Sequence, residues 1–521
     1  MTRPGAATLA GIACRKPAVG DDDAVCMIDG GRGYTRAQVR AAVAHRVGQL
    51  QESGIRRGER VLALIDHDAQ GLFFLAAASV LGLRLLMPYN LESAALAEWR
   101  TIAGAARPNA VVWLKADTTG VDDLCKIHSR VVVLSHEDGR DHGRAACLGG
   151  AVSDPGPIAH GAPTRNFLVL FTSGTTGAPK AISIGEQLIC RRVASVSSQL
   201  KFSRDAQVFM SGLLNNTTGV IFSFGALLHD AVLIFPDGRD VTRWPEQVAA
   251  QRVTHIMLRP IAMKRFVESA GGADLSSLRV VAYGAAAMPR AVLEAGRRLM
   301  PCDWVQGYGL SETYGPFCWL DEAAHRQRRY AQVYCVGRPD DTLEVRVDPL
   351  PGHPAGVGEV IVRGANLMQG YLDVTTGRIT PPGQWLRTGD LGQWSPEGDL
   401  LLEGRIASSV LSSNGHRIYP EEVEAVLADL PEVDDAVLIG LSAADTLHER
   451  PVACLSGRLA GREPDAIRQV LLDALGRALS REKWPELVYA ATTPFPKSAN
   501  DKVMRGEVRR LVDRAALIEL C

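Results

Sequence analysis

The amino-acid sequence predicts an α/β protein: a large N-terminal domain of mixed, mainly parallel sheets with helices and a β-rich subregion, followed by a small α+β C-terminal domain. Helical and strand patterns alternate through the first half of the chain, as in parallel sheets. Short strands with period-two alternation begin near Leu343, and the pattern changes again after Arg405. Because 521 residues exceed a usual domain of roughly 100–200, we expect domains at residues 1–405 and 406–521.

The first elements alternate regularly. Apolar side chains at helical spacing, with charges between them, predict a helix within residues 34–55. Residues 57–66 read as a short buried strand, residues 73–83 as a second helix, and residues 84–90 as a strand that ends near Pro88.

The alternation continues towards the middle of the chain. Residues 106–114 and 129–135 repeat the strand pattern, whereas residues 137–165 are rich in Gly, His, Asp and Pro and predict a long surface loop. A buried strand follows at residues 166–171. Further apolar runs that end in turn residues predict strands at 229–236, 253–260 and 277–284.

The C-terminal part carries different patterns. Short strands are predicted at residues 343–350, 358–364 and 399–405. A helix opened by Pro420, as proline at a first helical position favours, is followed by a strand that ends near residue 441. An amphipathic helix at 464–479 and two closing segments, 485–496 and 502–518, complete the predicted small domain.

Charge and cysteine usage exclude several classes of protein. The 57 Lys and Arg residues balance 58 Asp and Glu residues, for a net charge of −1, so the bulk charge does not suit duplex nucleic acid or an anionic membrane. The ten cysteines form no C-x-x-C or Cys/His cluster, which argues against a zinc site or a disulfide framework. The longest apolar stretch, residues 71–83, falls short of the ~20 residues that span a bilayer. We therefore expect a soluble, cytoplasmic protein.

The segment from Phe171 to Lys180, FTSGTTGAPK, has the strongest local signal. A buried strand runs into small hydroxyl and glycine residues, and glycine lets the backbone approach a ligand closely. Backbone N–H groups and hydroxyls of such a loop can surround phosphate oxygens, and Lys180 adds a cation. The predicted phosphate-binding residues are Thr172, Ser173, Gly174, Thr175, Thr176, Gly177 and Lys180. The loop lacks the Gly-Lys-[Ser/Thr] ending of a Walker A motif.

This loop resembles the phosphate-loop signature of the adenylate-forming superfamily, which contains acyl-CoA synthetases, peptide-synthetase adenylation domains and luciferases. QGYGLSET, ending at Thr313, is similar to a second motif of that family. The resemblance implies that Tyr308 stacks on adenine, that Gly309 and Ser311 lie at the nucleotide, and that Glu312 holds Mg²⁺. An aromatic face suits a purine and a hard carboxylate suits Mg²⁺.

Further segments follow in family order from about residue 34 to residue 512. WLRTGDLG is similar to the motif whose Asp390 accepts hydrogen bonds from ribose, and Arg405 is implied near ribose or phosphate. YGAAA resembles a stretch that lines the adenine and acyl pockets, here with Gly284, Ala285 and Ala286. The segments around Arg338 and Tyr371 match weaker family patterns, to which we assign a structural role.

The resemblance also implies a mobile C-terminal lid that carries a catalytic lysine. Lys502 fits that position in PKSANDKVMR, although Asp501 stands where glycine is usual, and Lys497 is a nearby competitor. The hinge position, normally Asp or Lys in the family, is Ala407. In the family this hinge absorbs a domain rotation between adenylation and acyl transfer, so the change bears on the transfer step. Gly415 is retained where relatives open a pantetheine tunnel. The implied catalytic residues are thus Lys502, Thr176 and Glu312.

The acid pocket departs from the family in the segment GLLNNTTG, which ends at Gly219. Many carboxylate-activating relatives carry an aromatic-His pair here, and the His position is Asn216, an uncharged donor and acceptor. Asn215 and Asn216 can equally cap a helix. The implied pocket residues are Asn215, Asn216, Thr217, Gly284, Gly309 and Gly315.

The resemblance implies an ATP- and Mg²⁺-dependent ligase that forms an AMP mixed anhydride of a small aryl or other carboxylic acid and transfers it to CoA. Transfer to a carrier protein or an amine is the alternative, including activation of nitrite and diazotisation of an aromatic amine. A non-catalytic nucleotide-binding protein is the alternative of another class; the retained Glu312, Asp390, Arg405 and Lys502 argue against it. No nucleic-acid or membrane partner is expected.

Overall fold

The computed structural model describes residues 8–17, 22–88, 96–118, 120–134, 166–172, 180–327, 335–412, 417–442, 449–497, 503–513 and 515–520. The loop predicted at residues 137–165 lies outside these ranges. No helix in the described ranges is both long enough and apolar enough to span a membrane.

The larger sheet has thirteen strands among the described residues, in the order β16-β17-β20-β21-β15-β14-β13-β12-β11-β9-β10-β1-β2. One half is mainly parallel and contains β1 (Val25–Asp29), β2 (Arg32–Thr35), β9 (Gln207–Phe209), β10 (Val232–Ile234), β11 (His255–Leu258), β12 (Val280–Gly284) and β13 (Asp303–Leu310). The other half is antiparallel and contains β14 (Gly315–Leu320), β15 (Cys335–Pro339), β16 (Glu344–Pro349), β17 (Gly358–Arg363), β20 (Leu386–Trp394) and β21 (Leu400–Arg405). This antiparallel half is the predicted β-rich subregion.

The second sheet has eight strands among the described residues, in the order β19-β18-β8-β7-β4-β3-β5-β6. The parallel part contains β3 (Arg60–Ile65), β4 (Arg84–Met87), β5 (Ala110–Leu114), β6 (Val131–Val133) and β7 (Leu168–Thr172). Three antiparallel strands extend it: β8 (Lys180–Ile184), β18 (Gly370–Leu372) and β19 (Ile379–Thr380). The chain therefore returns, almost two hundred residues after β8, to place β18 beside it.

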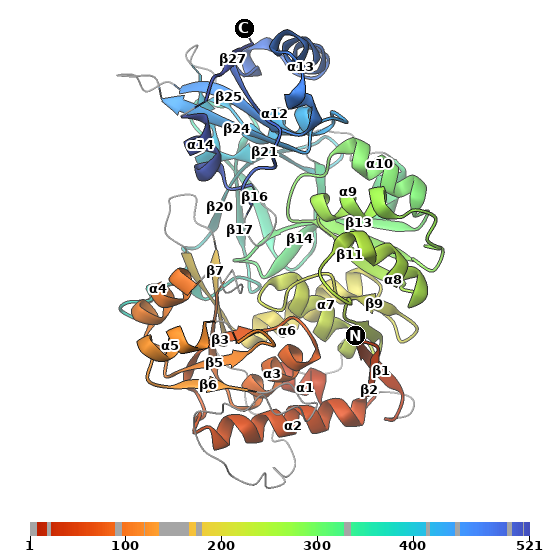
Figure 1. Ribbon diagram of the computed structural model, residues 1–521, viewed down its shortest axis with the longest axis vertical. Coiled ribbons are helices and arrows are strands. Elements are labelled where there is room, and N and C mark those ends of the chain that lie inside the picture. The colour runs from red at the N-terminus through yellow and green to blue at the C-terminus, as the bar shows by residue number, and fades with distance from the viewer. Residues whose placement is uncertain are drawn as a thin grey trace.

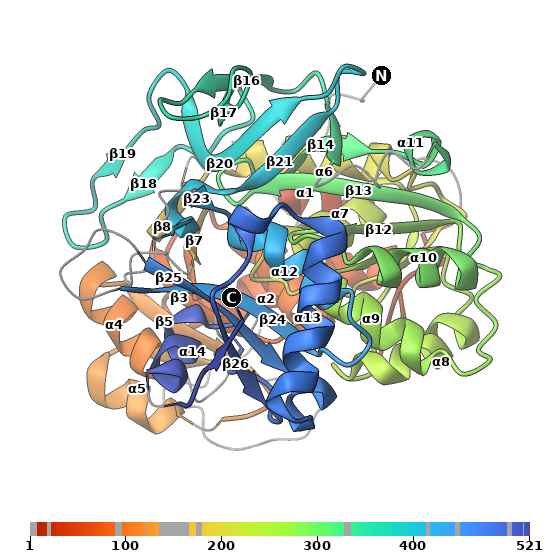
Figure 2. The same cartoon turned by 90° about the horizontal axis from the view of Figure 1, so that it is seen from above.

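Helices cover both faces of the parallel parts of these sheets (Figures 1 and 2). The largest core contains residues of both sheets and of α1 (Leu9–Ala13), α2 (Arg36–Glu52), α3 (Ala69–Val80), α6 (Glu186–Gln199) and α7 (Thr217–Leu228). Separate cores lie under α4 (Leu96–Ala106) and α5 (Val121–Ile127), and under α8 (Trp244–Ala250), α9 (Pro260–Ser269) and α10 (Arg290–Leu299). The cores on the two faces of a sheet are separate because successive side chains of a strand point to opposite faces. In β3, Val61 belongs to the largest core and Leu62 belongs to the core under α4 and α5.

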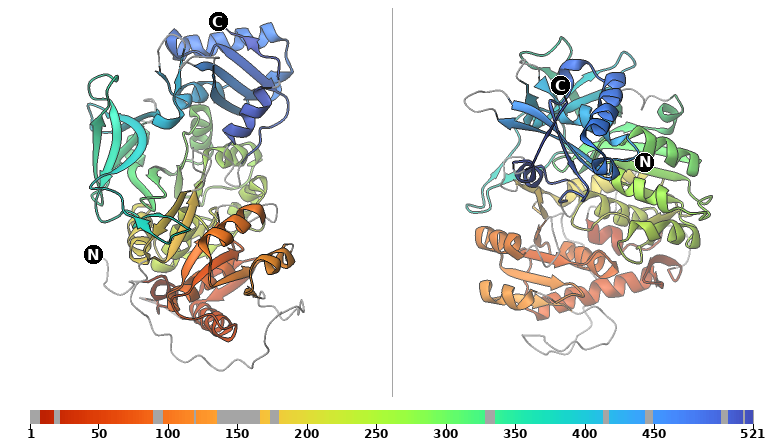
Figure 3. Two further views of the ribbon diagram at one scale, coloured as in Figure 1. Left: turned by 90° about the vertical axis from the view of Figure 1, so that its left-hand side faces the viewer. Right: turned by 45° about the horizontal axis from the view of Figure 1, so that its top comes forward.

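The C-terminal part forms a small α+β unit at the top of the molecule (Figure 1; Figure 3, left). Among the residues that the structure describes, its sheet has four strands: β24 (Asp435–Ser442), β25 (Glu449–Ser456), β26 (Leu487–Ala491) and β27 (Ile518–Glu519). Helices α12 (Pro420–Ala428) and α13 (Pro464–Ala478) pack on one core of this sheet, and α14 (Arg505–Val512) packs on the other. A short hairpin, β22 (Val410–Leu411) and β23 (Arg417–Ile418), precedes them. The predicted opening of α12 at Pro420 is confirmed.

Candidate active site

The ends of β12 and β13 lie against each other with almost no space between their backbones. A Cβ on Gly284 would lie 2.3 Å from the Gly307 carbonyl oxygen, and one on Gly309 would lie 2.2 Å from the Gly315 carbonyl oxygen. Gly315 also has φ +112°, and a Cβ there would meet Ile221 of α7 at 2.9 Å. These three predicted site glycines are thus required by close packing, and they bring β12, β13, β14 and α7 together. Ala285 follows directly with φ +67°, and Ala286 is exposed beside it.

Asp390 is the centre of a polar cluster that also contains Tyr308 and Arg405. It lies opposite Arg405 in the β20–β21 ladder, and the Arg405 Nε lies 2.7 Å from its Oδ1. The Tyr308 hydroxyl donates to its Oδ2 at 2.5 Å. Burial raises the pKa of Asp390, while the Arg405 charge and the Tyr308 hydrogen bond oppose that rise. Each carboxylate oxygen can accept more than one hydrogen bond, so Asp390 can accept further hydrogen bonds from hydroxyl groups.

The Tyr308 ring is held from two sides. Its hydroxyl is fixed on Asp390, and its ring packs edge-on against Phe317 of β14, with centroids 5.1 Å apart. Burial raises the pKa of Tyr308 well above its usual value, and Asp390 adds to the rise. The phenol is therefore a permanent donor, which fixes the ring plane at the strand end.

Glu312 lies in the turn after β13. The Tyr314 amide donates to the Ser311 carbonyl at 3.1 Å, and this closes the turn around Glu312. The Tyr371 hydroxyl donates to Glu312 Oε1 at 3.0 Å, and the Lys180 ammonium lies 5.5 Å from the centroid of the Tyr371 ring. Glu312 and Lys180, predicted from separate motifs, are thus connected through Tyr371.

The two ends of the predicted phosphate loop face each other. Thr172 and Lys180 are partners across the antiparallel β7–β8 ladder, so these two residues lie side by side. The loop residues Ser173, Gly174, Thr175, Thr176 and Gly177 lie outside the described residues. Lys502, Asp501 and Gly415 lie outside them too.

Lys497, the competitor of Lys502, has a structural partner. Its Nζ lies 2.6 Å from Asp435 Oδ1, and both side chains are largely buried. Ser456 donates to the other Asp435 oxygen at 3.0 Å. This pairing ties Lys497 into the sheet of the C-terminal unit and favours Lys502 for the catalytic position.

The asparagines at the predicted acid pocket hold the start of α7. Asn216 is its N-cap, with Oδ1 accepting from the Gly219 amide at 3.1 Å. Asn215 is buried and donates from Nδ2 to the Pro88 carbonyl at 2.9 Å. Thr217 is the first residue of the helix and is half-buried. The capping interpretation of Asn216 is confirmed, and a role at the acid pocket stays a prediction.

The connection to the C-terminal unit is tightly packed. Gly404 has φ +148°, and a Cβ there would lie 2.6 Å from Glu421 Oε2 of α12. Ala407 lies in a short 3₁₀ turn, Ile406–Ser408, whose Ser408 hydroxyl donates back to the Arg405 carbonyl at 3.2 Å. The hinge position thus offers a methyl group where the family pattern has a charge.

Sequence reasoning missed a buried network behind β12 and β13. His325 of α11 (Glu322–Arg326) lies 3.0 Å, through Nε2, from the Tyr283 hydroxyl, and its Nδ1 faces the Asp321 carbonyl at 2.7 Å. A carbonyl can only accept, so Nδ1 carries the proton and Nε2 accepts from Tyr283. The Tyr283 oxygen also lies 3.2 Å from the Gln306 side chain. The network therefore braces residues next to Gly284 and Tyr308.

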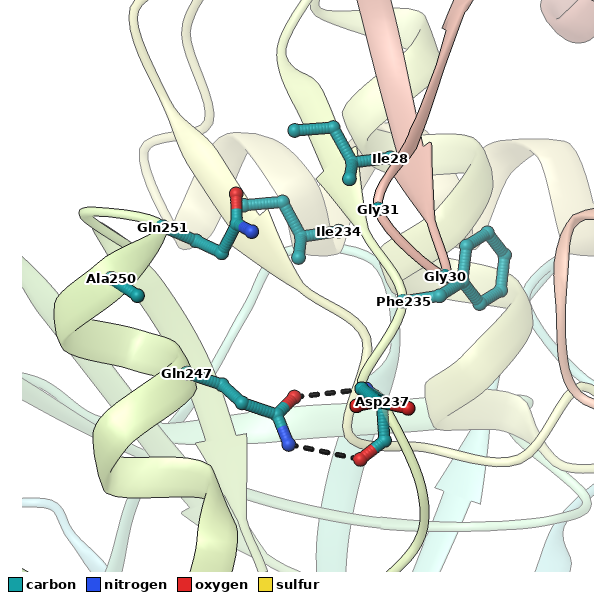
Figure 4. A pocket seen from close by; sticks show the side chains of 9 residues that line it. All are labelled: Ile28, Gly30, Gly31, Ile234, Phe235, Asp237, Gln247, Ala250 and Gln251. Carbon is teal, nitrogen blue, oxygen red and sulfur yellow. Dashed lines mark hydrogen bonds between the residues drawn. The ribbon is translucent and has the colours of Figure 1, made fainter.

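A separate cavity lies at the carboxyl ends of β1 and β10, against α8 (Figure 4). Its volume is about 370 Å³, and Gly30, Gly31, Phe235 and Gln251 are among its lining residues. The Gln247 side chain is fixed by two hydrogen bonds to the Asp237 backbone, at 2.8 and 2.9 Å. None of the predicted site residues lines this cavity.

Comparisons with known proteins give a consistent result. The sequence profile of the AMP-binding enzymes matches residues 14–372. The chain is 28% identical over 508 residues to the indoleacetate–CoA ligase of Aromatoleum aromaticum, covering 94% of this chain and 95% of that protein. It superposes on the anthranilate–CoA ligase AuaEII in complex with anthranoyl-AMP with a TM-score of 0.79, at 21% identity and 97% coverage of both chains. The amide bond synthetase McbA from Marinactinospora thermotolerans is similar at a TM-score of 0.78 and 25% identity, with 94% of this chain and 97% of that chain covered.

Proposed function

This chain belongs to the family of AMP-binding enzymes, and we propose that it is an adenylating ligase that activates a small aryl or other carboxylic acid with ATP and transfers it to CoA. One observation carries the proposal: the buried Asp390 lies between Tyr308 and Arg405. An acceptor carboxylate suits ribose hydroxyls, and the aromatic ring beside it suits adenine. Lys180 and Glu312 both contact Tyr371, and we assign them to the phosphates of the same nucleotide.

In the first half-reaction, a carboxylate oxygen of the acid attacks the α-phosphorus of ATP. The bond from that phosphorus to the bridging oxygen breaks, and pyrophosphate leaves with the electron pair. Lys180 and the loop that contains Thr176 bind the leaving phosphates, and Lys502 neutralises charge at the α-phosphate. Positioning and fixed charge supply the catalysis, because phosphoryl transfer needs little covalent participation by the protein.

Glu312 has the donor chemistry that Mg²⁺ prefers, a hard carboxylate oxygen. Within the described ranges, no group of three or more His, Cys, Asp or Glu residues could hold a metal ion by itself. Mg²⁺ commonly binds through one or two carboxylates together with substrate phosphates, so Glu312 would hold it jointly with ATP. When bound there, Mg²⁺ neutralises charge on the phosphate oxygens.

The acid is proposed to bind near the start of α7. The helix N-terminus favours a negative group, and the Asn216 cap leaves this end without a side-chain charge. Support for an aryl acid comes from the indoleacetate–CoA ligase, which is similar over nearly the whole chain. In the second half-reaction the CoA thiol attacks the acyl carbonyl, and AMP leaves.

A second candidate function is transfer to an amine. It is favoured by Ala407, which removes the usual charge from the hinge position, and by the likeness to an amide bond synthetase. The amine nitrogen would attack the same carbonyl, and AMP would leave with formation of an amide.

The acceptor is tested by product analysis with indoleacetate, anthranilate and 4-coumarate, each supplied with ATP and then with CoA, with an aliphatic amine, or with neither. We expect an acyl-CoA product and faster AMP release with CoA. If an amide forms and CoA has no effect on AMP release, the acceptor is an amine, as in the second candidate function, and not CoA. Nitrite with an arylamine forms a separate arm, in which a diazo product would replace both.

A further inference from the structure

We propose that Tyr371 is a positioning residue that holds Glu312 ready for Mg²⁺ and fixes Lys180 relative to it. The inference rests on the proposed nucleotide site and adds a residue to which sequence reasoning assigned only a structural role. Tyr371 lies on β18, far in sequence from both groups that it contacts.

Tyr371 reaches Glu312 through its hydroxyl. Its O–H donates to Glu312 Oε1 at 3.0 Å. An ionised carboxylate can only accept hydrogen bonds, so the Tyr371 hydroxyl is the donor. With Oε1 engaged in this way, rotation of the Glu312 carboxylate is restricted.

The backbone before Tyr371 fixes the same glutamate. The Met368 amide donates to the Glu312 carbonyl oxygen at 2.7 Å. Main chain and side chain of Glu312 are thus both held by the segment from Met368 to Tyr371. A carboxylate that is already oriented by such hydrogen bonds binds a metal ion more tightly, because its side chain loses less conformational freedom when the ion binds.

The ring of Tyr371 contacts Lys180. Tyr371 pairs with Ile182 and Gly370 with Ser183 in the β18–β8 ladder, which places the ring next to the first residue of β8, Lys180. The Lys180 ammonium lies 5.5 Å from the ring centroid, within the range of a cation–π contact. Lys180 is exposed, so this contact restricts a side chain that would otherwise sample many rotamers.

Hydroxyl and ring therefore have separable tasks, and two substitutions distinguish them. Tyr371→Phe removes the hydrogen bond to Glu312 and keeps the ring beneath Lys180. Tyr371→Leu removes both. Tyr489→Phe, in the C-terminal sheet, is the matched control for loss of a tyrosine hydroxyl far from Glu312.

The experiment is calorimetric titration of ATP into each full-length protein, once with Mg²⁺ and once with EDTA, together with the Mg²⁺ concentration for half-maximal pyrophosphate release. For Tyr371→Phe we expect that concentration to rise roughly tenfold, as for loss of other metal-site partners. The gain in ATP affinity on adding Mg²⁺ should shrink in the same variant, while affinity in EDTA stays at the wild-type value. Tyr371→Leu should also bind ATP more weakly in EDTA, and Tyr489→Phe should match the wild type throughout.

A wild-type Mg²⁺ response in Tyr371→Phe would overturn the positioning role while leaving the adenylating function intact. Equal behaviour of the Phe and Leu variants in EDTA would overturn the role of the ring. If the wild-type protein gains no ATP affinity and no activity from Mg²⁺, the metal role of Glu312 falls together with the inference.

Discussion

At the scale of single residues, the predicted site depends on how charges are paired. Asp390 and Arg405 were predicted from motifs fifteen positions apart, and the antiparallel ladder places them opposite each other. The sequence did not indicate that the Tyr308 hydroxyl would share this carboxylate, because β13 and β20 are separated by three other strands of the sheet. Tyr371 was missed for the same reason: its partners, Glu312 and Lys180, are distant in sequence.

Arg405→Gln tests the pairing through pH. The Arg405 charge opposes the rise that burial causes in the pKa of Asp390, so its removal should raise that pKa further. Asp390 would then be protonated at higher pH and lose acceptor capacity, and the acidic limb of kcat/KM for ATP should move to higher pH. At neutral pH, loss of a charged hydrogen bond should raise KM for ATP about tenfold or more.

The matched control is Arg338→Gln, which removes an arginine that pairs with Asp399 at 3.2 Å elsewhere in the same sheet. It should leave the acidic limb in place. An unchanged limb in Arg405→Gln would contradict the assignment of Asp390 to nucleotide binding.

At the scale of elements, sequence patterns located strands β3 to β7, strands β10 to β12 and the helix at Pro420, because each carries its own periodicity. Strands β1, β9 and β13 of the same parallel regions were not predicted. The pairing of β18 with β8 could not be predicted, since β18 has only three residues and its partner lies far back in the chain. The small helix α11 is a similar case. Its five residues carry no clear periodicity, yet His325 braces the strands that position Gly284 and Tyr308.

His325→Gln tests this brace. Burial lowers the pKa of His325 to about 4 from its usual 6.5, so the unfolded chain binds a proton more readily than the folded protein between these values. The contribution of neutral, buried His325 to the free energy of unfolding is therefore fully present above pH 6.5 and is lost as pH falls towards 4. Between pH 7 and pH 5 this histidine should cost the wild type about 2 kcal/mol of unfolding free energy.

Urea denaturation at both pH values measures the effect. The Gln variant should be less stable at pH 7 but lose less on acidification than the wild type. Gln327→Ala, at the end of the same helix, keeps His325 and should retain the wild-type dependence. An equal loss in wild type and His325→Gln would show that His325 does not titrate as the buried network requires.

At the scale of the whole molecule, the two sheets meet where Tyr371 of the second sheet contacts Glu312, which follows β13 of the larger sheet, and a small C-terminal unit follows them in the chain. The sequence indicated this division because its patterns change near Leu343 and after Arg405. It could not indicate how the C-terminal unit contacts the rest. The Ala291 amide at the start of α10 donates to Asp429 Oδ1 at 3.3 Å, and Lys264 of α9 donates to the Val433 carbonyl at 3.1 Å. We propose that the division falls at Arg405, where β21 ends and the 3₁₀ turn Ile406–Ser408 begins.

The central claim is that an acid is joined to AMP with release of pyrophosphate, and isotope exchange tests it most directly. Labelled pyrophosphate is incubated with the protein, ATP and Mg²⁺, with CoA and amines left out, in the presence or absence of each acid. We expect label to enter ATP only when a suitable acid is present, and we expect Asp390→Ala to weaken this exchange. Exchange that is independent of the acid, or ATP cleavage to ADP and phosphate with no exchange for any aryl, fatty, amino or inorganic acid, would contradict it.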